Sequence, residues 1–390
     1  MIRNGYHQPR EVLTSAAAVK VTVPRVNDKR TDAVAGERRR FYDYPAEHLV
    51  HLAPVLNAAS SWNAPAAGGM ILEIHPPEAA GRGHARLAAP GVAMVEVPAS
   101  VRTLAADRRF TQLRPAGGGV EFQVFEATAP DGSKVVLRTP VGERFQSNPN
   151  DRNVDTRSLL RWEYVVTRHL DQLGFPVATP RELVLGEPDV LVSDFVADDG
   201  RGADQVALGA LLLRLHRSPP PPMPPVAAYG LPAAHLLPRR IADRFAELAA
   251  FVATLPAAPP VERLASVLAS RPAGRLVHLD VRASNIRCTG GAVCGLLDWS
   301  NALTGDPAME LGRLAEYALL PQNGIDYEAV LDGYRKPVPV DSAAFWVYRL
   351  DAAVMLVLLF NSEASHAELG PPAVDRLREV HLRLVRELSS

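Results

Sequence analysis

Cysteine is scarce in this chain, which carries only Cys288 and Cys294 among its 390 residues. Two thiols exclude both a disulfide framework and a zinc site with four cysteine ligands. They flank the turn segment 289–292 and could lie near each other on a hairpin. Because small thiols are common in protein cores, we expect both to be reduced core residues.

Long uncharged apolar runs are also missing. The longest, Ala352 to Phe360, has nine residues, whereas a helix needs about 20 to span a bilayer. The amino terminus has a few arginines but no apolar stretch of signal-peptide length. These absences predict a cytoplasmic protein without a membrane segment.

Neither sign of charge dominates, since 42 Lys and Arg face 43 Asp and Glu, for a formal net charge of -1 at pH 7. This balance gives no electrostatic basis for binding nucleic acid or a membrane surface. Apolar residues make up 47% and charged residues 22%, as in an ordinary globular protein. We therefore expect small molecules or individual proteins as partners.

Strand and turn signals after Arg109 predict a small antiparallel sheet. Three short apolar runs, 110–113, 123–128 and 134–138, are separated by the triplet Gly117-Gly118-Gly119 and by the turn segment 130–132. A helix is predicted over Thr156 to Leu173, with Asp155 as N-cap and Gly174 as its stop. On this helix Glu163 faces the buried side, where a carboxylate needs a cationic partner.

The rest of the chain is mainly helical. A strand at Val190 to Phe195 leads to a loop and to a leucine-rich helix over Val206 to Arg217, which ends at a proline run. A sheet with one helix, a connecting strand and then helices predicts an α+β fold of two lobes. The expected domains are an N-terminal extension of unknown role (1–108), a sheet lobe (109–196) and a helical lobe (197–390).

The most informative segment runs from His278 to Asp306. It places Asp280 and Asn285 on one loop, in the spacing H-x-D-x-x-x-x-N, and Asp298 at a strand end after a hairpin with a Gly-Gly turn. One carboxylate can accept a proton from an attacking hydroxyl, while the other two oxygen ligands hold magnesium against a nucleotide triphosphate. In a structural alternative, Asp280 and Asn285 merely cap and close a buried loop.

These residues resemble the aminoglycoside phosphotransferase family, small-molecule kinases with the protein-kinase architecture. The family pattern is H-G-D-x-x-x-x-N, then I-D-W, then G-D-P and a helix, and this chain reads HLDVRASN, LDW and GDP, with Asp306 as a predicted helix cap. The resemblance covers about residues 109–390. It implies a small nucleotide-binding antiparallel sheet followed by a helical lobe that holds the catalytic loop and the acceptor site.

The resemblance also implies a role for each matching residue. Asp280 would be the base that deprotonates the acceptor hydroxyl, Arg282 would reach the γ-phosphate, and Asn285 and Asp298 would hold Mg²⁺. The residues implied in nucleotide binding are Gly117, Gly118, Gly119, Arg138, Glu163, Asp194, Phe195 and Val196. Arg138 stands where kinases carry a lysine, and its planar fork would give Glu163 a fixed partner; a purely structural ion pair is the alternative.

The expected function is a Mg²⁺-dependent transfer of the γ-phosphoryl group of ATP or GTP to a hydroxyl of a small molecule such as an antibiotic, a sugar or an amino alcohol. Two alternatives remain open at this point. The chain could be a kinase for Ser or Thr of a peptide or protein that residues 1–108 recognise. It could also be a catalytically silent binding protein with a kinase-like fold, an alternative that the arginine at position 138 keeps open.

Overall fold

The computed structural model describes residues 2–6, 10–13, 18–21, 24–27, 96–119, 121–146, 154–222, 231–250, 252–335, 342–363 and 368–389. The chain divides into two compact units, 1–94 and 95–390. In the first unit, two antiparallel pairs are described: β1 (Ile2–Tyr6) with β4 (Pro24–Asn27), and β2 (Arg10–Leu13) with β3 (Ala18–Val21).

A five-stranded antiparallel sheet forms the first lobe of the second unit, in the order β10-β11-β7-β6-β5. Its strands are β5 (Thr111–Gly118), β6 (Phe122–Thr128), β7 (Lys134–Pro140), β10 (Pro180–Val184) and β11 (Val190–Asp194). The short antiparallel pair of β8 (Phe145–Gln146) and β9 (Val154–Asp155) lies between β7 and β10 in the sequence. The three strands and the connecting strand predicted from the sequence therefore form, each bound within five residues of its expected position.

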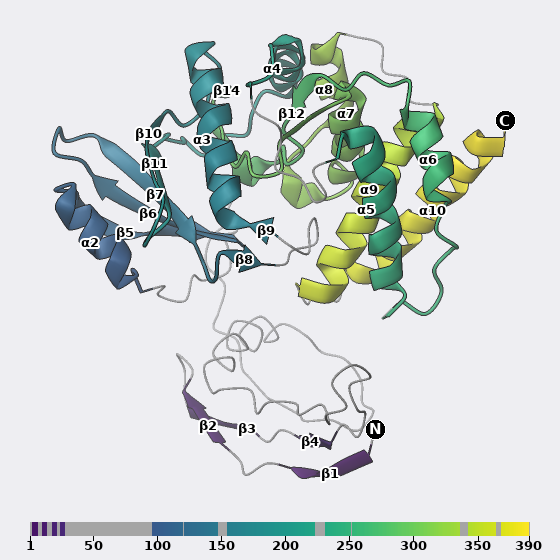
Figure 1. Ribbon diagram of the computed structural model, residues 1–390, viewed down its shortest axis with the longest axis horizontal. Coiled ribbons are helices and arrows are strands. Elements are labelled where there is room, and N and C mark those ends of the chain that lie inside the picture. Colours follow the sequence, from purple (N-terminus) through teal and green to yellow (C-terminus); the bar gives the residue numbers. More distant parts are fainter. Residues whose placement is uncertain are drawn as a thin grey trace, which may run out of the picture. The chain divides into compact units, whose positions relative to one another are not determined.

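Two helices cover opposite faces of the sheet (Figure 1). Helix α2 (Ala99–Asp107) packs Val101 and Leu104 against Phe125 and Leu137, while α3 (Thr156–Gln172) packs against Phe122 on the other side. The sequence placed the first boundary at 108, whereas α2 belongs by its contacts to the unit that begins at 95. Helix α2 and the sheet thus belong to the same compact unit.

The predicted ends of α3 have a direct local cause. The Asp155 side chain accepts hydrogen bonds from the N–H groups of Arg157 and Ser158, which satisfies donors that a helix start leaves open. Gly174 takes the left-handed conformation after the helix, at φ +64°, which glycine adopts without steric cost. Glu163 is 7% exposed, on the buried side as its spacing predicts.

The second lobe is helical, with short strand pairs set into it. Its helices are α4 (Gln205–Arg217), α5 (Ala233–Leu248), α6 (Val261–Leu268), α7 (Pro307–Tyr317), α8 (Tyr327–Tyr334), α9 (Ala343–Leu358) and α10 (Gly370–Ser389). Its strands are β12 (Arg275–Val277), β13 (Ile286–Thr289), β14 (Ala292–Leu296) and β15 (Leu303–Gly305). Helices α4 and α8 touch through glycine, since a Cβ on Gly209 would lie 2.0 Å from the carbonyl oxygen of Val330.

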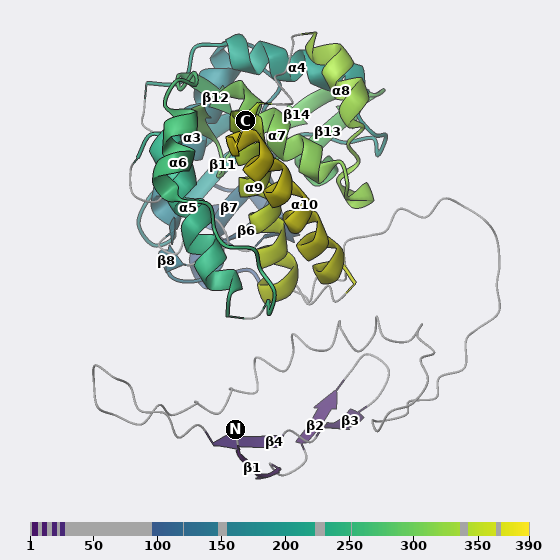
Figure 2. The ribbon, with the colours of Figure 1, turned by 90° about the vertical axis from the view of Figure 1, so that its right-hand side faces the viewer.

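Helix α9 is the centre of this lobe. It packs against α5, α7 and α10, and Figure 2 shows α10 lying along it. Among the described residues, the stretch 343–361 alone has the length and hydropathy of a membrane-crossing helix, with 78% of its apolar window buried inside the protein. Its Asp351 is paired with Arg240 and Arg244. Counting uncharged runs missed this helix, because charged residues interrupt it; its burial identifies it as a core helix.

Both cysteines are free thiols, as predicted, but only Cys288 is a core residue, since Cys294 is half-buried. They lie on the β13–β14 hairpin, where Cys288 pairs with Val293 and not with Cys294. Gly290 and Gly291 form its turn at φ +60° and +84°.

Candidate active site

The H-x-D-x-x-x-x-N loop lies between a strand pair and a hairpin. Strand β12 pairs with β15 and delivers the chain to His278, and the 3₁₀ turn η4 (Ala283–Asn285) then leads into β13. The N–H of Leu297 donates to the carbonyl oxygen of Asn285 at 2.8 Å. This bond closes the loop against the end of β14, so residues 280, 285 and 298 come together.

The Asp280 carboxylate is 6% exposed and is held by three side chains. Asn285 Nδ2 donates to Oδ2 at 2.8 Å, and the Tyr317 hydroxyl donates to Oδ1 at 3.1 Å. Arg282 Nη2 lies 3.2 Å from Oδ2. Asn285 Nδ2 also donates to the backbone carbonyl oxygen of Asp280 at 2.9 Å. The side-chain oxygen of Asn285 therefore points away from Asp280.

His278 acts as a structural hydrogen bonder. Its Nδ1 accepts the N–H of Asp280 at 3.1 Å, and its Nε2 lies 3.0 Å from the carbonyl oxygen of Leu297. A neutral imidazole with its proton on Nε2 satisfies both contacts. The ring also packs edge-on against Trp299, with the centroids 4.5 Å apart. His278 therefore ties the loop of Asp280 to the segment that carries Asp298.

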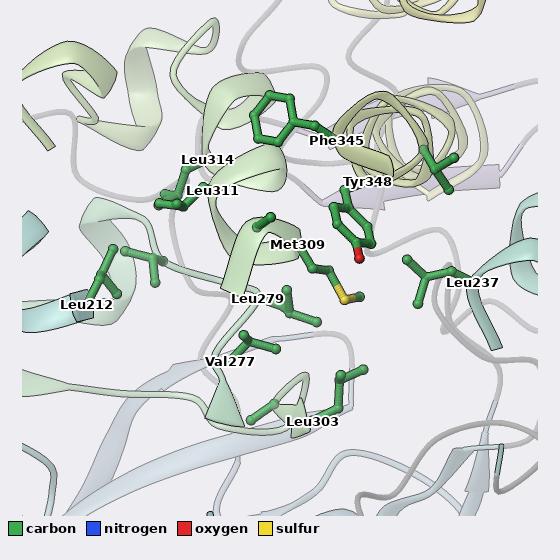
Figure 3. Packing of buried hydrophobic residues seen from close by; sticks show 14 of the residues in the cluster. Leu212, Leu237, Val277, Leu279, Leu303, Met309, Leu311, Leu314, Phe345 and Tyr348 are labelled. Carbon is green, nitrogen blue, oxygen red and sulfur yellow. The ribbon is translucent and has the colours of Figure 1, made fainter. Parts of the chain in front are cut away.

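Leu279 has an unusual backbone for a leucine, at φ +63°, where a Cβ crowds the following carbonyl oxygen. Two side chains of α7 hold it there. Glu310 accepts the N–H groups of His278 and Leu279, at 2.5 and 2.9 Å. Arg313 Nη1 donates to the carbonyl oxygen of Leu279 at 2.7 Å. The leucine side chain itself is 1% exposed in the core shown in Figure 3.

The sheet lobe contributes Arg138, whose guanidinium spans two carboxylates. Its Nη1 lies 3.1 Å from Glu163 Oε1 and its Nη2 lies 2.8 Å from Asp298 Oδ1. The guanidinium also lies 4.4 Å from the centre of the Phe122 ring. The predicted Arg138–Glu163 pair is thus present, and it extends to Asp298, which the sequence did not indicate.

Burial and this shared cation set the protonation of the site. Burial raises the pKa of Glu163 to about 7, because the attraction between Arg138 and the ionised carboxylate only partly offsets the hydration that the carboxylate loses. Burial also disfavours a charged Asp298, but Arg138 and the Ser300 hydroxyl outweigh it and lower the pKa of Asp298 to about 2. Asp298 is therefore ionised at neutral pH.

The glycines 117–119 and the segment 194–196, which the resemblance implies in nucleotide binding, lie on the sheet lobe. Gly117 and Gly118 end β5, and the N–H of Gly119 donates to the carbonyl oxygen of Phe122 at 2.8 Å in the hairpin that follows. Asp194 ends β11 and pairs with Arg181. The N–H of Phe195 donates to the carbonyl oxygen of Lys134 at 3.1 Å, and Val196 packs on β14, where a Cβ on Gly295 would lie 2.8 Å from it.

Three residues of α7 that shape the loop are absent from the sequence-based set: Glu310, Arg313 and Tyr317. The capping of α7 is as predicted, since the Asp306 side chain accepts the N–H of Ala308 at 3.0 Å with Pro307 in the first turn. Glu310, in the first turn of α7, reaches the loop as well. The available signal was the spacing of residues 310, 313 and 317, which places them on one helix face.

The described residues hold no group of three or more His, Cys, Asp or Glu side chains in metal-binding geometry. Mg²⁺ is usually bound through one or two protein oxygens together with substrate phosphates and water. Asn285 and Asp298 have suitable oxygens. The Asn285 amide is oriented by its donated bonds, and Asp298 Oδ2 makes no hydrogen bond with the described residues. The donor set therefore fits a magnesium ion shared with phosphate.

A family model described as the phosphotransferase enzyme family matches residues 112–345, well over half of the chain. No curated protein matches significantly.

Three solved structures illustrate the structural similarity. A thermostable mutant of the aminoglycoside phosphotransferase APH(4)-Ia, in a ternary complex with ADP and hygromycin B, is 16% identical with a TM-score of 0.51, covering 72% of this chain and 97% of its own. The gentamicin complex of APH(2")-IIa is 14% identical at TM-score 0.50, covering 73% and 97%. The macrolide 2'-phosphotransferase MphH of Brachybacterium faecium, an apoenzyme, is 20% identical at 0.44, covering 71% and 98%. The first two confirm the predicted two-lobed kinase-like fold.

Proposed function

Because this chain belongs to the phosphotransferase enzyme family, as its loop motif predicted, we propose that it transfers the γ-phosphoryl group of ATP or GTP to a hydroxyl of a small molecule. The observation that carries this proposal is the convergence of three oxygen-bearing side chains. Asp280, Asn285 and Asp298 meet where the catalytic loop closes against the end of β14. The fold alone would not distinguish a transferase from a binding protein.

Asp280 is the proposed base. It accepts the proton of the acceptor hydroxyl as that oxygen forms a bond to the γ-phosphorus, while the bond to the bridging oxygen breaks and the nucleoside diphosphate leaves. Its orientation is fixed beforehand by Asn285 and Tyr317. Arg282, whose side chain is 43% exposed, is long enough to turn from Asp280 toward the phosphate. General-base assistance of this kind contributes roughly 10²- to 10⁴-fold in rate.

Asn285 and Asp298 would hold Mg²⁺, which supplies charge neutralisation for the phosphates. Arg138 keeps Asp298 ionised and in place. The backbone of segment 194–196, the glycine hairpin 117–119 and the Arg138–Glu163 pair would bind the nucleotide from the sheet lobe. Each of these assignments follows from the family pattern together with the position of the residue.

One contact favours the catalytically silent alternative. Arg138 Nη2 donates a hydrogen bond to Oδ1 of Asp298. This oxygen would otherwise be available to bind a metal ion. Oδ2 makes no hydrogen bond with the described residues, and this second oxygen supports the active reading.

The test is nucleotide consumption with ATP and GTP across hydroxyl-bearing antibiotics, sugars, amino alcohols and peptides, with and without Mg²⁺. Asp280→Ala should lower turnover by roughly 10²-fold or more while nucleotide-induced thermal stabilisation persists. Asp332→Ala, an exposed carboxylate on α8, is the matched control and should retain full turnover. Retained turnover in Asp280→Ala would overturn the assignment, and the absence of turnover with every acceptor would favour the silent protein.

A further inference from the structure

The two lobes are connected by the linker 197–204, which lies along the β13–β14 hairpin and is hydrogen-bonded to it. The N–H of Asp199 donates to the carbonyl oxygen of Cys288 at 3.0 Å. The N–H of Asp204 donates to the carbonyl oxygen of Gly291 at 2.9 Å. The linker is therefore attached both to strand β13 and to the turn of the hairpin.

Two carboxylates of the linker add side-chain contacts to this attachment. Asp198 Oδ1 accepts the N–H of Cys288 at 3.2 Å, and Asp199 Oδ2 accepts the N–H of Gly290 at 2.6 Å. A hydrogen bond from a backbone N–H to an ionised carboxylate is stronger than one between neutral groups. Both aspartates are exposed, so they add nothing to the core, and what they contribute is the attachment of the hairpin to the linker.

The segment 194–196, just before the linker, packs on the same hairpin. Gly295 of β14 is buried, and a Cβ at this position would lie 2.8 Å from Val196 Cγ1. A side chain at 295 would therefore push the two apart. The absence of one lets Val196 lie directly on the backbone of β14.

The hairpin also carries the two proposed metal ligands. Asn285 directly precedes β13, and Asp298 follows the end of β14 by two residues. The segment 194–196, which would bind the nucleotide from the sheet lobe, and the residues that would hold Mg²⁺ are thus parts of one hydrogen-bonded unit. A ligand held at two points gains affinity from the second point only where the spacing of the two sites matches it.

We propose that Asp198 and Asp199 are positioning residues that couple the binding of the nucleotide to the binding of Mg²⁺. They would do so by fixing segment 194–196 relative to Asn285 and Asp298. The inference rests on the proposed function, since it requires a nucleotide and a metal ion at these sites. Each aspartate acts through the hairpin backbone to which it is bonded. Without them both sites remain, but their spacing varies, so each ligand assists the other less.

The experiment measures the affinity of the full chain for non-hydrolysable analogues of ATP and GTP by calorimetry, with and without Mg²⁺. Mg²⁺ should raise the affinity of the unaltered chain by a factor that measures the coupling. In the double variant Asp198→Ala, Asp199→Ala this factor should fall by about tenfold, the equivalent of one hydrogen bond to a charged group. The affinity without Mg²⁺ should stay unchanged. The double variant Asp198→Asn, Asp199→Asn keeps an acceptor oxygen at each position and should retain the factor.

Asp326→Ala is the matched control. Asp326 is also exposed and accepts a backbone N–H, that of Ala329 at 3.2 Å, but it does so as the cap of α8. The control should leave the factor unchanged. A lower melting temperature with an unchanged factor in the double alanine variant would reveal a purely structural role and overturn the inference. An equal fall of the factor in the double asparagine variant would also overturn it, because charge and not position would then be the cause.

The unaltered chain separates this inference from the function on which it rests. If it binds neither analogue under either condition, the proposed function fails and the inference fails with it. If it binds an analogue but gains no affinity from Mg²⁺, the coupling alone is overturned.

Discussion

Arg138 Nη2 lies 2.8 Å from Asp298 Oδ1, a contact between residues 160 positions apart in the chain. The same guanidinium binds Glu163 on α3, so a single side chain joins the sheet, its covering helix and the end of the catalytic hairpin. Each of the three is less than one-third exposed at the side chain. A lysine ammonium, as a single point on a flexible stem, would not bind both carboxylates with fixed geometry.

Removing this cation should be costly. Arg138→Met leaves the buried Glu163 and the half-buried Asp298 without their partner, and we expect the free energy of unfolding to fall by about 3–5 kcal/mol. The measurement is urea denaturation at neutral pH, compared with Arg114→Met. Arg114 pairs with Glu126 from a side chain that is 65% exposed, and its loss should cost less than about 1 kcal/mol. Equal losses in the two variants would show that the Arg138 contacts contribute little.

The pH dependence of stability should reveal the carboxylate that shares this cation. The pKa of Glu163 is raised from 4.5 to about 7, so between these values the folded protein binds more protons than the unfolded chain. Stability therefore falls as pH rises through this window. Glu163→Gln cannot titrate and should lack this fall. The difference between the two proteins should change on the order of 3 kcal/mol between pH 4.5 and 7, since one pKa unit is about 1.4 kcal/mol; parallel stability curves would contradict the buried, titrating carboxyl.

Tyr317 should act as a positioning residue for the proposed base. Tyr317→Phe removes the hydroxyl that donates to Asp280 Oδ1 and keeps the ring in its apolar cluster. A hydrogen bond to a charged group contributes about 1.5–3 kcal/mol, so kcat should fall by roughly tenfold or more while the KM for nucleotide stays unchanged. Tyr327→Phe is the control, because that hydroxyl is buried and makes no hydrogen bond with the described residues. If both variants lower kcat equally, or if KM alone changes, Tyr317 has no positioning role.

The sequence predicts those features of the fold that neighbouring residues determine, and it does not predict those that depend on tertiary packing. The starts of α3 and α7 follow from neighbours within three residues, and both were predicted, with Asp155 and Asp306 as caps. Helix α2 lies within the segment 1–108 that was assigned to the extension, because only its packing on Phe125 shows that it belongs to the sheet lobe. Local pattern determines elements, and tertiary packing determines which lobe they join.

The site divides in the same way. The loop spacing indicated Asp280, Asn285 and Asp298, and the helical period indicated the burial of Glu163, so these residues could be chosen without coordinates. The contact of Arg138 with Asp298 and that of Tyr317 with Asp280 join residues far apart in sequence. No sequence periodicity predicts these two contacts. The first depends on how the two lobes are placed, and the second on how α7 is placed against the catalytic loop. The roles of these residues in catalysis stay predictions.

The last prediction concerns Leu279, which stands where the family pattern has glycine. At φ +63° a residue with a Cβ is strained, by roughly 1–2 kcal/mol relative to glycine. Leu279→Ala and Leu279→Gly both lose the buried side chain, but only glycine relieves the strain, so the glycine variant should be more stable by about 1 kcal/mol. Leu314 on α7, buried equally at 1% exposure and labelled in Figure 3, is the control; there the order should reverse, with alanine more stable by about 1 kcal/mol. Urea denaturation of the four variants tests the pair of signs. If alanine is the more stable at both positions, Glu310 and Arg313 do not hold Leu279 in a strained conformation, and the loop reaches its geometry without the help of α7.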